Sequence, residues 1–487
     1  MRTYRMYIAD TWVEAESGET YEAINPALGE PFAKVAQGGR NDARRAIAAA
    51  NEAAGTWAKV PLWERAALCV KMAGAIEAHL AELAEILCTE LGKPLYGEAR
   101  DEAKEAPVNF RNAAEQAKWM EGSVYSVQDP HKRVISFRQP RGVVAVITPW
   151  NFPAAIPTEY LPYAIVMGNT VVWAPAPTAA VTATKLMELM VAAGLPNGVI
   201  NLVTGPGAEV GDELVVNPGT HAIGMTGSPK TGKLISSRCG LKPRLFELGG
   251  NGPTVVLDDA DPEKAAAAIA PACFYAAGQV CQCAERILVA ERLKKNFTAA
   301  MVEQSQRWRW GDPRDPEVNM GPQNNLAVVE KITAHLADAT RKGATIVAGG
   351  KRPNRPGFFH EPTVLTDFTP DSLINTEETF GPIAPISGFA SDEEAWRYIN
   401  ACNLGLVSAV FTRDVDRAWR WGEALRTGIT VVNDFTNYWE LHLPFGGRSG
   451  TDSGVGRIGG RYTLEFMSDL KTIAFHVASN REDGLCL

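Results

Sequence analysis

The sequence predicts a multidomain α/β fold built on parallel sheets, and three observations lead to this class. The chain has 487 residues, more than one hydrophobic core usually holds, so two or three domains are expected. Hydrophobic residues make up 46% and charged residues 21%, which is ordinary for a globular protein. From residue 141 onward, short Val-rich and Ile-rich runs alternate with segments of helical periodicity, as βαβ units do.

The first hundred residues are predicted to be rich in helix. Apolar residues recur at helical spacing over 41–54 and 61–91, with Asn41 as a candidate N-cap and Gly92-Lys93-Pro94 as a stop signal. Two series of strands and helices follow. Strands are expected at 143–147, 169–174, 199–205, 221–227, 254–259, 286–291 and 344–350, and helices after Pro153, at 179–193, 209–216 and 229–239, around Cys273 and at 292–306. Residues 124–139 and 471–477 are expected to form an exposed hairpin and a late strand, whose edges need partners outside their own domain.

Charge and composition exclude several classes of protein. A net charge of −8 leaves no basic surface, so no nucleic-acid partner is expected. Residues 1–16 do not resemble a signal peptide. The most apolar segment, 154–175, is interrupted by two prolines and a glutamate, so it predicts a core helix and strand and not a membrane span. Eight cysteines without an export signal predict reduced thiols in the cytoplasm. Cys281 and Cys283 have neither a second cysteine pair nor a nearby His, so no metal site is expected.

Three polar residues stand out as candidates for covalent catalysis on a carbonyl group. Cys281 lies in FYAAGQVCQCAER, Glu247 lies in the expected turn FELGGNGP, and Asn151 follows the strand 143–147 in TPWNFP. A soft nucleophile, a carboxylate and an amide donor are the groups needed to attack a carbonyl, activate water and hold an oxyanion. Each also has a structural interpretation: a buried Cys packs as a small hydrophobe, a Glu in a turn is solvated, and an Asn caps a helix.

Two glycine-rich turns are candidates for binding a nucleotide. The segment 205–211 follows a strand and opens a helix, but its GxGxxxG spacing is one residue longer than the dinucleotide-binding fingerprint, and it is equally consistent with a turn that binds nothing. The segment 227–233 matches GxxxxGK, the pattern of a P-loop, but Leu234 replaces the Ser or Thr that binds Mg²⁺. The same residues make sense as a helix N-terminus near a pyrophosphate.

Seven motifs, taken together, resemble those of the NAD(P)-dependent aldehyde dehydrogenase superfamily. They are TPWNFP, VVW-PAPT, MTGSPKTG, FELGGNGP, GQVCQCAER, EETFGP and LPFGG, and the resemblance extends in order over about residues 5 to 478. The resemblance implies a Rossmann-like cofactor domain at 1–117 and 141–249 and an α/β catalytic domain at 250–466. It also implies a small β oligomerisation flap at 118–140 and 467–487, and hence a homodimer or homotetramer.

By this resemblance, Cys281 attacks a small-molecule aldehyde, Asn151 and the Cys281 backbone N–H hold the oxyanion, and Glu247 activates the water that releases the acid. Because free Cys has a pKa of about 8.5, some local stabilisation of the thiolate is expected. The cofactor is expected to be NAD or NADP, in contact with Trp150, Ala174, Pro175, Gly207, Gly211, Gly227, Ser228, Leu248, Glu378 and Phe380. The presence of Glu247 favours hydrolysis over transfer of the acyl group to coenzyme A.

The chain departs from the family pattern at three places. Ala174 stands where most members have Lys, and Pro177 stands where NAD-preferring members often have Glu, so the choice between NAD and NADP stays open. The run RSGTD at 448–452 is about two residues longer than usual and is expected at the mouth of the substrate tunnel.

The expected substrate pocket comprises Phe152, Ile156, Glu159, Tyr275, Val280, Gln282, Tyr438, Trp439 and Phe445. Members that oxidise carboxylate-bearing semialdehydes tend to have Arg where this chain has Glu159, so an apolar or aromatic aldehyde is expected. The alternative is an aminoaldehyde, bound through cation–π contact, or a semialdehyde. Glu159 has a second interpretation, in which it points into the helix packing and pairs with Arg or Lys, and Arg448 is a candidate to reach an anionic tail.

Two other classes of protein compete with this enzyme. A nucleoside-triphosphate-binding protein would use Gly227 to Lys233, and Leu234 argues against it. A non-enzymatic relative of the dehydrogenases would have no reason to keep Cys281, Glu247 and Asn151 together.

Overall fold

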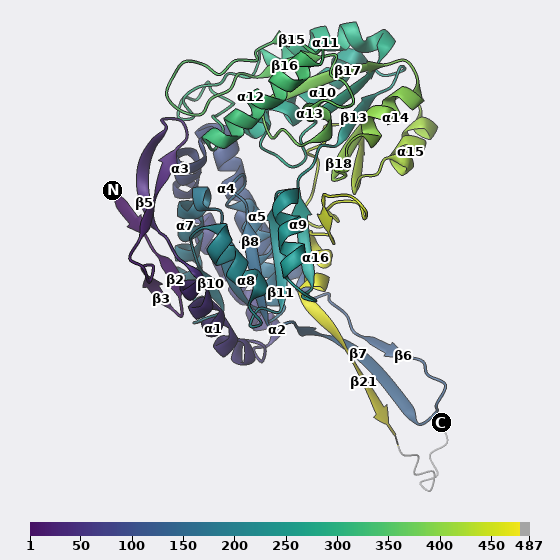
Figure 1. The fold of residues 1–487 in the computed structure, drawn as a ribbon. Helices are drawn as coiled ribbons and strands as arrows, with labels where there is room; N and C mark the ends of the chain where they lie inside the picture. The colour runs from purple at the N-terminus through teal and green to yellow at the C-terminus, as the bar shows by residue number, and fades with distance from the viewer. Residues whose placement is uncertain (478–487) are drawn as a thin grey trace.

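A computed structural model describes residues 1–477 of the chain. In Figure 1 an α/β layer made by the middle of the sequence lies above a second α/β layer made by the N-terminal half, and a narrow β arm projects from the lower layer. Both layers are built on mainly parallel sheets, which confirms the predicted fold class.

The lower layer is organised around an eight-stranded sheet. Its strands are β2 (Met6–Ile8), β3 (Thr11–Val13), β8 (Val143–Thr148), β9 (Thr170–Pro175), β10 (Ile200–Leu202), β11 (Ala222–Gly227), β12 (Arg244–Leu248) and β20 (Gly454–Val455), in the order β20-β12-β11-β8-β9-β10-β2-β3. The strands from β8 to β12 are parallel. The chain winds from β8 to β9 on one side and reaches β11 on the other, so the carboxyl ends of these strands open a crevice of the kind in which open α/β sheets bind ligands.

Helices cover both faces of this sheet. They are α1 (Arg40–Trp57), α2 (Leu62–Glu77), α3 (Leu80–Leu91), α4 (Arg100–Ala117), α5 (Ala155–Thr158), α6 (Leu161–Val166), α7 (Ala180–Ala192), α8 (Asp212–Val216), α9 (Pro229–Arg238) and α16 (Gly460–Phe466). The predicted N-cap at Asn41 is wrong: Gly39 is the N-cap, and its N–H donates to the Asp42 carboxylate inside the first turn. The single predicted helix at 61–91 is two helices, α2 and α3, which the chain separates at Ala78 and His79.

The N-terminal segment also contains strands that the helix-rich expectation missed. Strands β1 (Arg2–Tyr4), β4 (Thr20–Asn25) and β5 (Glu30–Ala36) form a small sheet, while β2 and β3 extend the eight-stranded sheet. β1, β2 and β3 have three residues each, too few for an alternating pattern to be recognised.

The upper layer has a seven-stranded sheet flanked by helices. Its strands are β13 (Pro253–Val256), β14 (Arg286–Ala290), β15 (Thr345–Ala348), β16 (Thr363–Thr366), β17 (Ile383–Phe389), β18 (Val407–Phe411) and β19 (Ile429–Val432), in the order β15-β16-β17-β14-β13-β18-β19. The helices are α10 (Pro262–Phe274), α11 (Glu291–Ser305), α12 (Leu326–Arg341), α13 (Leu373–Thr376), α14 (Asp392–Asn400) and α15 (Val415–Ala424).

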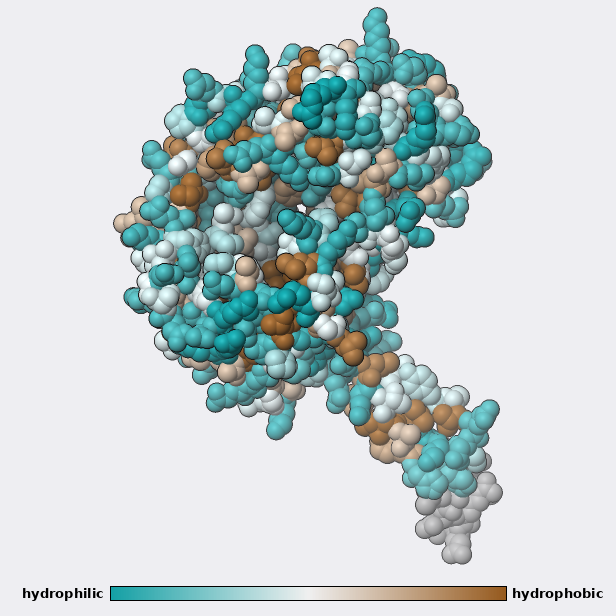
Figure 2. Space-filling model, viewed as in Figure 1, coloured by the Kyte–Doolittle hydropathy of each residue, from teal (hydrophilic) through white to brown (hydrophobic). Residues whose placement is uncertain are grey.

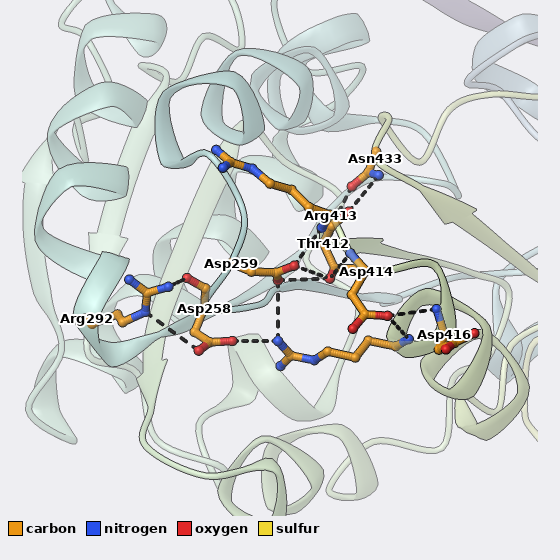
Figure 3. Close-up of polar contacts among 9 residues, drawn as sticks. Asp258, Asp259, Arg292, Thr412, Arg413, Asp414, Asp416 and Asn433 are labelled. Carbon is orange, nitrogen blue, oxygen red and sulfur yellow. Dashed lines mark hydrogen bonds and ion pairs between the residues drawn. The ribbon is translucent and has the colours of Figure 1, made fainter.

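A polar cluster ties together the carboxyl ends of β13, β18 and β19 (Figure 3). The Asp259 carboxylate accepts hydrogen bonds from the Thr412 hydroxyl and the Arg413 N–H, both at 2.8 Å. Asn433 exchanges two hydrogen bonds of 2.9 Å with the Thr412 backbone, and Arg417 donates to Asp258 at 2.6 Å. These bonds satisfy the carboxylates internally, so the cluster holds the sheet edge in place.

The arm is a three-stranded antiparallel sheet of β6 (Ser123–Tyr125), β7 (Lys132–Pro140) and β21 (Ser468–His476). β7 and β21 pair along their whole lengths, from Ser468 opposite Pro140 to His476 opposite Lys132, so the predicted hairpin and late strand are each other's partners. Apolar side chains gather along the arm in Figure 2, among them the exposed Val124, Leu470 and Phe475. The end of the predicted flap, 478–487, lies outside the described residues, as does the eighth cysteine, Cys486.

The seven cysteines within residues 1–477 are free thiols. None of the helices in this part of the chain is long and apolar enough to cross a membrane. The cytoplasmic location stays a prediction.

Candidate active site

Two cavities meet at the three candidate catalytic residues. A cavity of about 200 Å³ opens at the carboxyl ends of β8, β11 and β12, and a second of about 170 Å³ lies on the other side of Cys281. Both are lined by Asn151, Glu247 and Cys281, which the fold therefore brings together from three separate segments of the chain.

Glu247 lies at the end of a buried strand and not in the expected turn, so the alternative that it is merely solvated is wrong. β12 places it opposite Thr226 of β11 and Gly454 of β20, and its side chain is 3% exposed. Burial raises the pKa of Glu247 to about 8, and the neighbouring Cys281 thiol lowers it by less. The carboxylate oxygen Oε1 is buried without a hydrogen-bond partner among the described residues. A carboxyl group with a free acceptor and a pKa near neutrality is suited to accept a proton.

Cys281 is half-buried between the two cavities. Burial, followed by the Glu247 carboxylate, raises the pKa of the Cys281 thiol well above its usual range. The Glu247 carboxylate disfavours the thiolate, so the expected local stabilisation of the thiolate stays a prediction. The Cys281 thiol and Glu247 form an acid–base pair in which Glu247 is the neighbour that can take the thiol proton.

Asn151 is buried in the loop after β8, with 6% of its surface exposed. Its Nδ2 donates to the carbonyl of Gln279, two residues before Cys281, at 3.0 Å. Gln279 is fixed in turn, because its Oε1 accepts from the Asn324 N–H at 2.8 Å. The amide of Asn151 is thus held against the loop that carries the nucleophile, where an amide donor can face an oxyanion.

Two strained segments flank the nucleophile. Ala276 and Ala277 have φ of 51° and 53°, and Phe380 has φ of 62°, all in the left-handed region that non-glycine residues rarely adopt. The Glu98 carboxylate accepts the Ala276 N–H at 2.8 Å, and Glu285 accepts the Phe380 N–H at 2.6 Å. Neither glutamate was singled out in the sequence, because the backbone groups they bind lie far away along the chain.

The buried cation of Lys93 supports the wall of the second cavity, a role that the sequence did not indicate. Lys93, expected only as part of a helix stop, pairs with the Glu102 carboxylate at 2.6 Å, with 6% and 0% of the two side chains exposed. Its ammonium lies 3.5 Å from the centre of the Phe152 ring. Glu102 also accepts the Ala154 N–H at 2.8 Å, so the pair holds the loop between β8 and α5.

The first cavity contains most of the residues expected to contact a dinucleotide. Trp150, Gly227, Ser228, Leu248, Glu378 and Phe380 line it. Ser228 caps α9, accepting the Thr231 N–H at 3.2 Å. Glu378 accepts the Gly250 N–H at 2.9 Å, and burial raises its pKa to about 7. Lys331, which the sequence did not indicate, also lines this cavity and lowers that pKa.

The remaining cofactor candidates lie outside this cavity. Ala174 and Pro175 end β9 beside Ile147 and Thr148 of β8. Gly207 and Gly211 bound a π-helical turn before α8, so the GxGxxxG segment does not open a regular helix. The extra residue in its spacing is accommodated by this wider turn.

The P-loop interpretation is not supported. Ser228 caps α9 through its side chain, and Lys233 forms an exposed ion pair of 2.8 Å with Asp452. The lysine therefore points toward the 448–452 run and does not face a phosphate-binding turn.

The second cavity is lined by aromatic and acidic side chains. Eight of the nine expected pocket residues are present: Phe152, Ile156, Glu159, Tyr275, Val280, Gln282, Trp439 and Phe445. Tyr438 is the exception, because it is 47% exposed and its hydroxyl donates to Glu440 at 3.0 Å. The cavity also includes Glu105, Ala155, Asn437 and Ile458, which the sequence did not indicate.

Glu159 lines the second cavity and forms no ion pair within residues 1–477, so the interpretation that it pairs inside the helix packing is wrong. Burial, and next the Glu247 carboxylate, raise its pKa well above the usual range. With Glu105, this gives three carboxyl groups and neither Lys nor Arg among the residues that line the cavity.

The 448–452 run does not line the second cavity, contrary to expectation. The Arg448 N–H donates to the Gly405 carbonyl and the Asp452 N–H to the Asn403 carbonyl, both at 2.9 Å. These bonds hold the run against residues 403–405, so Arg448 is not among the groups that face the substrate side.

Comparison with known proteins decides the family. The model of the aldehyde dehydrogenase family matches residues 12–473. The chain belongs to this family. The resemblance in the motifs and the predicted enzyme class are thereby confirmed.

Among similar aldehyde dehydrogenases, the NADP⁺ succinate-semialdehyde dehydrogenase of Escherichia coli (strain K12) is 37% identical over 94% of this chain and 95% of its own length. Glutarate-semialdehyde dehydrogenase of Pseudomonas aeruginosa is 36% identical over 96% of both chains. The solved structure of betaine aldehyde dehydrogenase from Staphylococcus aureus with NAD⁺ is 33% identical, covers 97% of this chain and 94% of that one, and has a TM-score of 0.93. These names agree with the predicted cofactor class. They favour the semialdehyde or aminoaldehyde alternative over the apolar or aromatic aldehyde expected first.

Proposed function

We propose that this chain oxidises an aldehyde to the carboxylic acid through a covalent intermediate on Cys281, with NAD or NADP as hydride acceptor. The observation that carries the proposal is the meeting of two cavities at Cys281, Glu247 and Asn151. One cavity is available to a dinucleotide and the other to an aldehyde, with the nucleophile between them.

The first cavity fits a nicotinamide dinucleotide. It opens at the crevice of the parallel sheet and includes the N-terminus of α9, whose N–H groups and dipole favour a pyrophosphate. Glu378 offers a carboxylate acceptor for ribose hydroxyls, and Trp150 and Phe380 form an edge-to-face aromatic pair with centres 5.5 Å apart. When bound there, the cofactor would supply the acceptor for the hydride that leaves the aldehyde carbon.

The protein groups would act in sequence. Glu247 takes the thiol proton, and the Cys281 thiolate attacks the aldehyde carbon to form a tetrahedral adduct. Nδ2 of Asn151 and the Cys281 N–H donate to the oxyanion, a contribution of about 3–4 kcal/mol where such donors have been removed. After oxidation to the thioester, Glu247 releases the thiol proton to solvent and then accepts a proton from water. The resulting hydroxide adds to the acyl carbon and displaces the Cys281 sulfur as thiolate.

For the substrate, the geometry favours an aminoaldehyde. Burial raises the pKa values of Glu159 and Glu105, and a cationic tail would favour their ionised forms and pair with them. The rings of Tyr275 and Trp439 offer faces for cation–π contact. A carboxylate tail would meet acidic groups without a lysine or arginine on the cavity wall.

A carboxylate-bearing semialdehyde is the second candidate, because several similar proteins carry such names. It requires Glu159 to be protonated, so that the acid donates a hydrogen bond to the substrate carboxylate. The raised pKa of Glu159 is compatible with that state.

A panel of aldehydes separates the candidates. An aminoaldehyde such as 4-aminobutanal is expected to have the highest kcat/KM, above benzaldehyde and succinic semialdehyde. Glu159→Gln should lower kcat/KM for the aminoaldehyde about tenfold or more and leave the neutral benzaldehyde nearly unchanged. Succinic semialdehyde at the top of the ranking would favour the second candidate.

For the cofactor, we propose activity with both NAD⁺ and NADP⁺. Pro177 removes the carboxylate that would repel a 2′-phosphate, and Ala174 removes the cation that would attract one. Each loss is worth about 1–3 kcal/mol, so the two nearly cancel in the selectivity. A preference beyond roughly a thousandfold in kcat/KM for either cofactor would mean that another residue governs the choice.

We also propose a homodimer or homotetramer assembled through the arm. Within residues 1–477 the outer edges of its outer strands pair with no other strand, and Val124, Leu470 and Phe475 are 82%, 57% and 47% exposed. Such a surface in water needs a partner. Light scattering at micromolar concentration is expected to give a multiple of the 52.6 kDa chain mass; a monomeric mass would overturn the proposal.

The predicted division of roles between domains also remains a proposal, with one adjustment. Residues 454–466, assigned to the catalytic domain, form β20 and α16, and β20 pairs with β12 of the lower sheet. We therefore propose that this segment belongs structurally with the cofactor-binding part.

A further inference from the structure

Arg286 is a buried cation that the proposed mechanism does not use. It begins β14, five residues after Cys281, and is 1% exposed. Its Nε donates to the Asn251 carbonyl at 2.7 Å, and its Nη1 donates to the Tyr398 and Ile399 carbonyls at 3.0 and 3.2 Å. Within residues 1–477, Nη2 donates no hydrogen bond and Arg286 forms no ion pair. A buried charge is costly unless it is paired, and Arg286 has only neutral partners.

Glu285 does not serve as the counter-ion. Its two carboxylate oxygens accept the Thr379 and Phe380 N–H groups at 2.5 and 2.6 Å. Burial raises the pKa of Glu285 to about 8, so the carboxyl group carries little negative charge at neutral pH. Burial also lowers the pKa of Arg286, and Cys402 and Glu285 offset that effect only in part.

Arg286 lines a small cavity that contains no acidic residue. The cavity holds about 20 Å³, room for one particle the size of a water molecule. Its walls are Pro253, Arg286, Ile399, Asn400, Cys402, Asn403, Leu404, Arg426, Thr427 and Thr451. Arg426 is exposed at this cavity, forms no ion pair within residues 1–477, and makes one long hydrogen bond of 3.5 Å to the Gly450 carbonyl.

We propose that this cavity binds one small inorganic anion, of the size and charge of chloride, between Arg286 and Arg426. Within residues 1–477, Nη2 of Arg286 donates no hydrogen bond, and Arg286 and Arg426 both line a cavity whose walls include no carboxylate. The volume excludes carboxylates and phosphate, which have several heavy atoms.

The proposed anion site joins three segments of the chain near the nucleophile loop, residues 279–285, which carries Cys281. Arg286 follows that loop directly, Asn400 ends α14 and Cys402 to Leu404 follow it, and Thr451 belongs to the 448–452 run. Through Thr451, the 448–452 run thus lines the anion cavity and not the second cavity. Because the anion binds the folded chain, it stabilises the folded state by mass action.

The test uses thermal unfolding of the full-length protein in sodium chloride, balanced with sodium gluconate to constant ionic strength. Tm is expected to be flat at low chloride and to rise with the logarithm of chloride concentration above the dissociation constant. Replacing Arg286 would also remove its bonds to three carbonyls, so the variant is Arg426→Gln. In Arg426→Gln, Tm should begin to increase only at a chloride concentration about tenfold or more higher than in the wild type.

Arg448→Gln is the matched control, because it removes the same charge from the adjoining run at a residue that does not line the cavity. It should leave the chloride dependence unchanged. In crystals grown in sodium bromide, an anomalous peak is expected beside Nη2 of Arg286. A water molecule there without anomalous signal, or the same chloride dependence in Arg426→Gln and wild type, would overturn the proposal.

Discussion

Ionisation of Glu247 is expected to set the pH dependence of aldehyde oxidation. Burial raises its pKa to about 8, so the form that can accept a proton increases as pH rises through that value. With a pKa near 8, Glu247 is almost wholly protonated at pH 6 and mostly ionised at pH 9, so kcat should rise by more than about tenfold over that range. The measurement is the steady-state rate with saturating aldehyde and cofactor between pH 6 and 9.

Glu247→Gln separates the two steps that this residue could assist. Removing the base should slow deacylation by about 10²–10⁴-fold. A burst of reduced cofactor should remain in rapid mixing, but at a lower rate, because water replaces Glu247 as the acceptor of the thiol proton. The rise in kcat near pH 8 should disappear with the carboxyl group. Equal steady-state rates in both enzymes, with no burst in either, would refute the assignment.

The same variant has a second, independent readout at the thiol. Because the Glu247 carboxylate helps to raise the pKa of Cys281, its replacement by a neutral amide should move the pH dependence of Cys281 alkylation by iodoacetamide to lower pH. Mass spectrometry identifies the modified residue. An alkylation profile that does not move, or moves to higher pH, would show that the two groups do not interact as the structure places them.

Further predictions concern the nucleophile and the support beneath the pocket. Cys281→Ala should abolish dehydrogenase and esterase activity while dinucleotide binding measured by calorimetry is retained, because other residues form most of the first cavity. Cys283→Ala should remain active, since that thiol is buried and donates to the Gly278 carbonyl at 3.3 Å. An inactive Cys283→Ala beside an active Cys281→Ala would instead identify Cys283 as the nucleophile. Lys93→Met should destabilise the chain by about 3–5 kcal/mol, because it leaves the Glu102 carboxylate buried without its cation. The double variant Lys93→Met/Glu102→Gln should be more stable in thermal unfolding than Lys93→Met alone. A double variant whose loss of stability equals the sum of the two single losses would contradict this explanation.

The elements and residues that could be predicted are those with a local signature. β8, β9, β11 and β14 are short apolar runs between helical segments, and their alternation is visible without knowledge of their partners. Cys281, Glu247 and Asn151 lie in motifs of six to nine residues, so the sequence alone was enough to select them. Tyr438 and Trp439 illustrate the limit: adjacent aromatic residues look alike in the sequence, but one lines the cavity and the other faces solvent.

The glutamates that hold the loops of the active site in place have no local sequence signature. Glu98, Glu102 and Glu285 lie in helical or loop segments where an exposed carboxylate would be ordinary. The backbone N–H groups they bind lie 178, 52 and 94 residues away, at Ala276, Ala154 and Thr379. Only the tertiary fold shows that these glutamates are buried acceptors.

The strained loops and the buried glutamates together explain how the nucleophile is fixed. A non-glycine residue in the left-handed region costs about 1–2 kcal/mol, while a hydrogen bond contributes about 0.5–1.5 kcal/mol to stability. Glu98 therefore offsets much of the strain at Ala276, and Glu285 does the same at Phe380. Because Glu285 belongs to the nucleophile loop, its bonds to Thr379 and Phe380 also join Cys281 to the wall of the first cavity. The bonds that offset the strain are thus the same bonds that hold the nucleophile loop beside the Glu378–Phe380 segment.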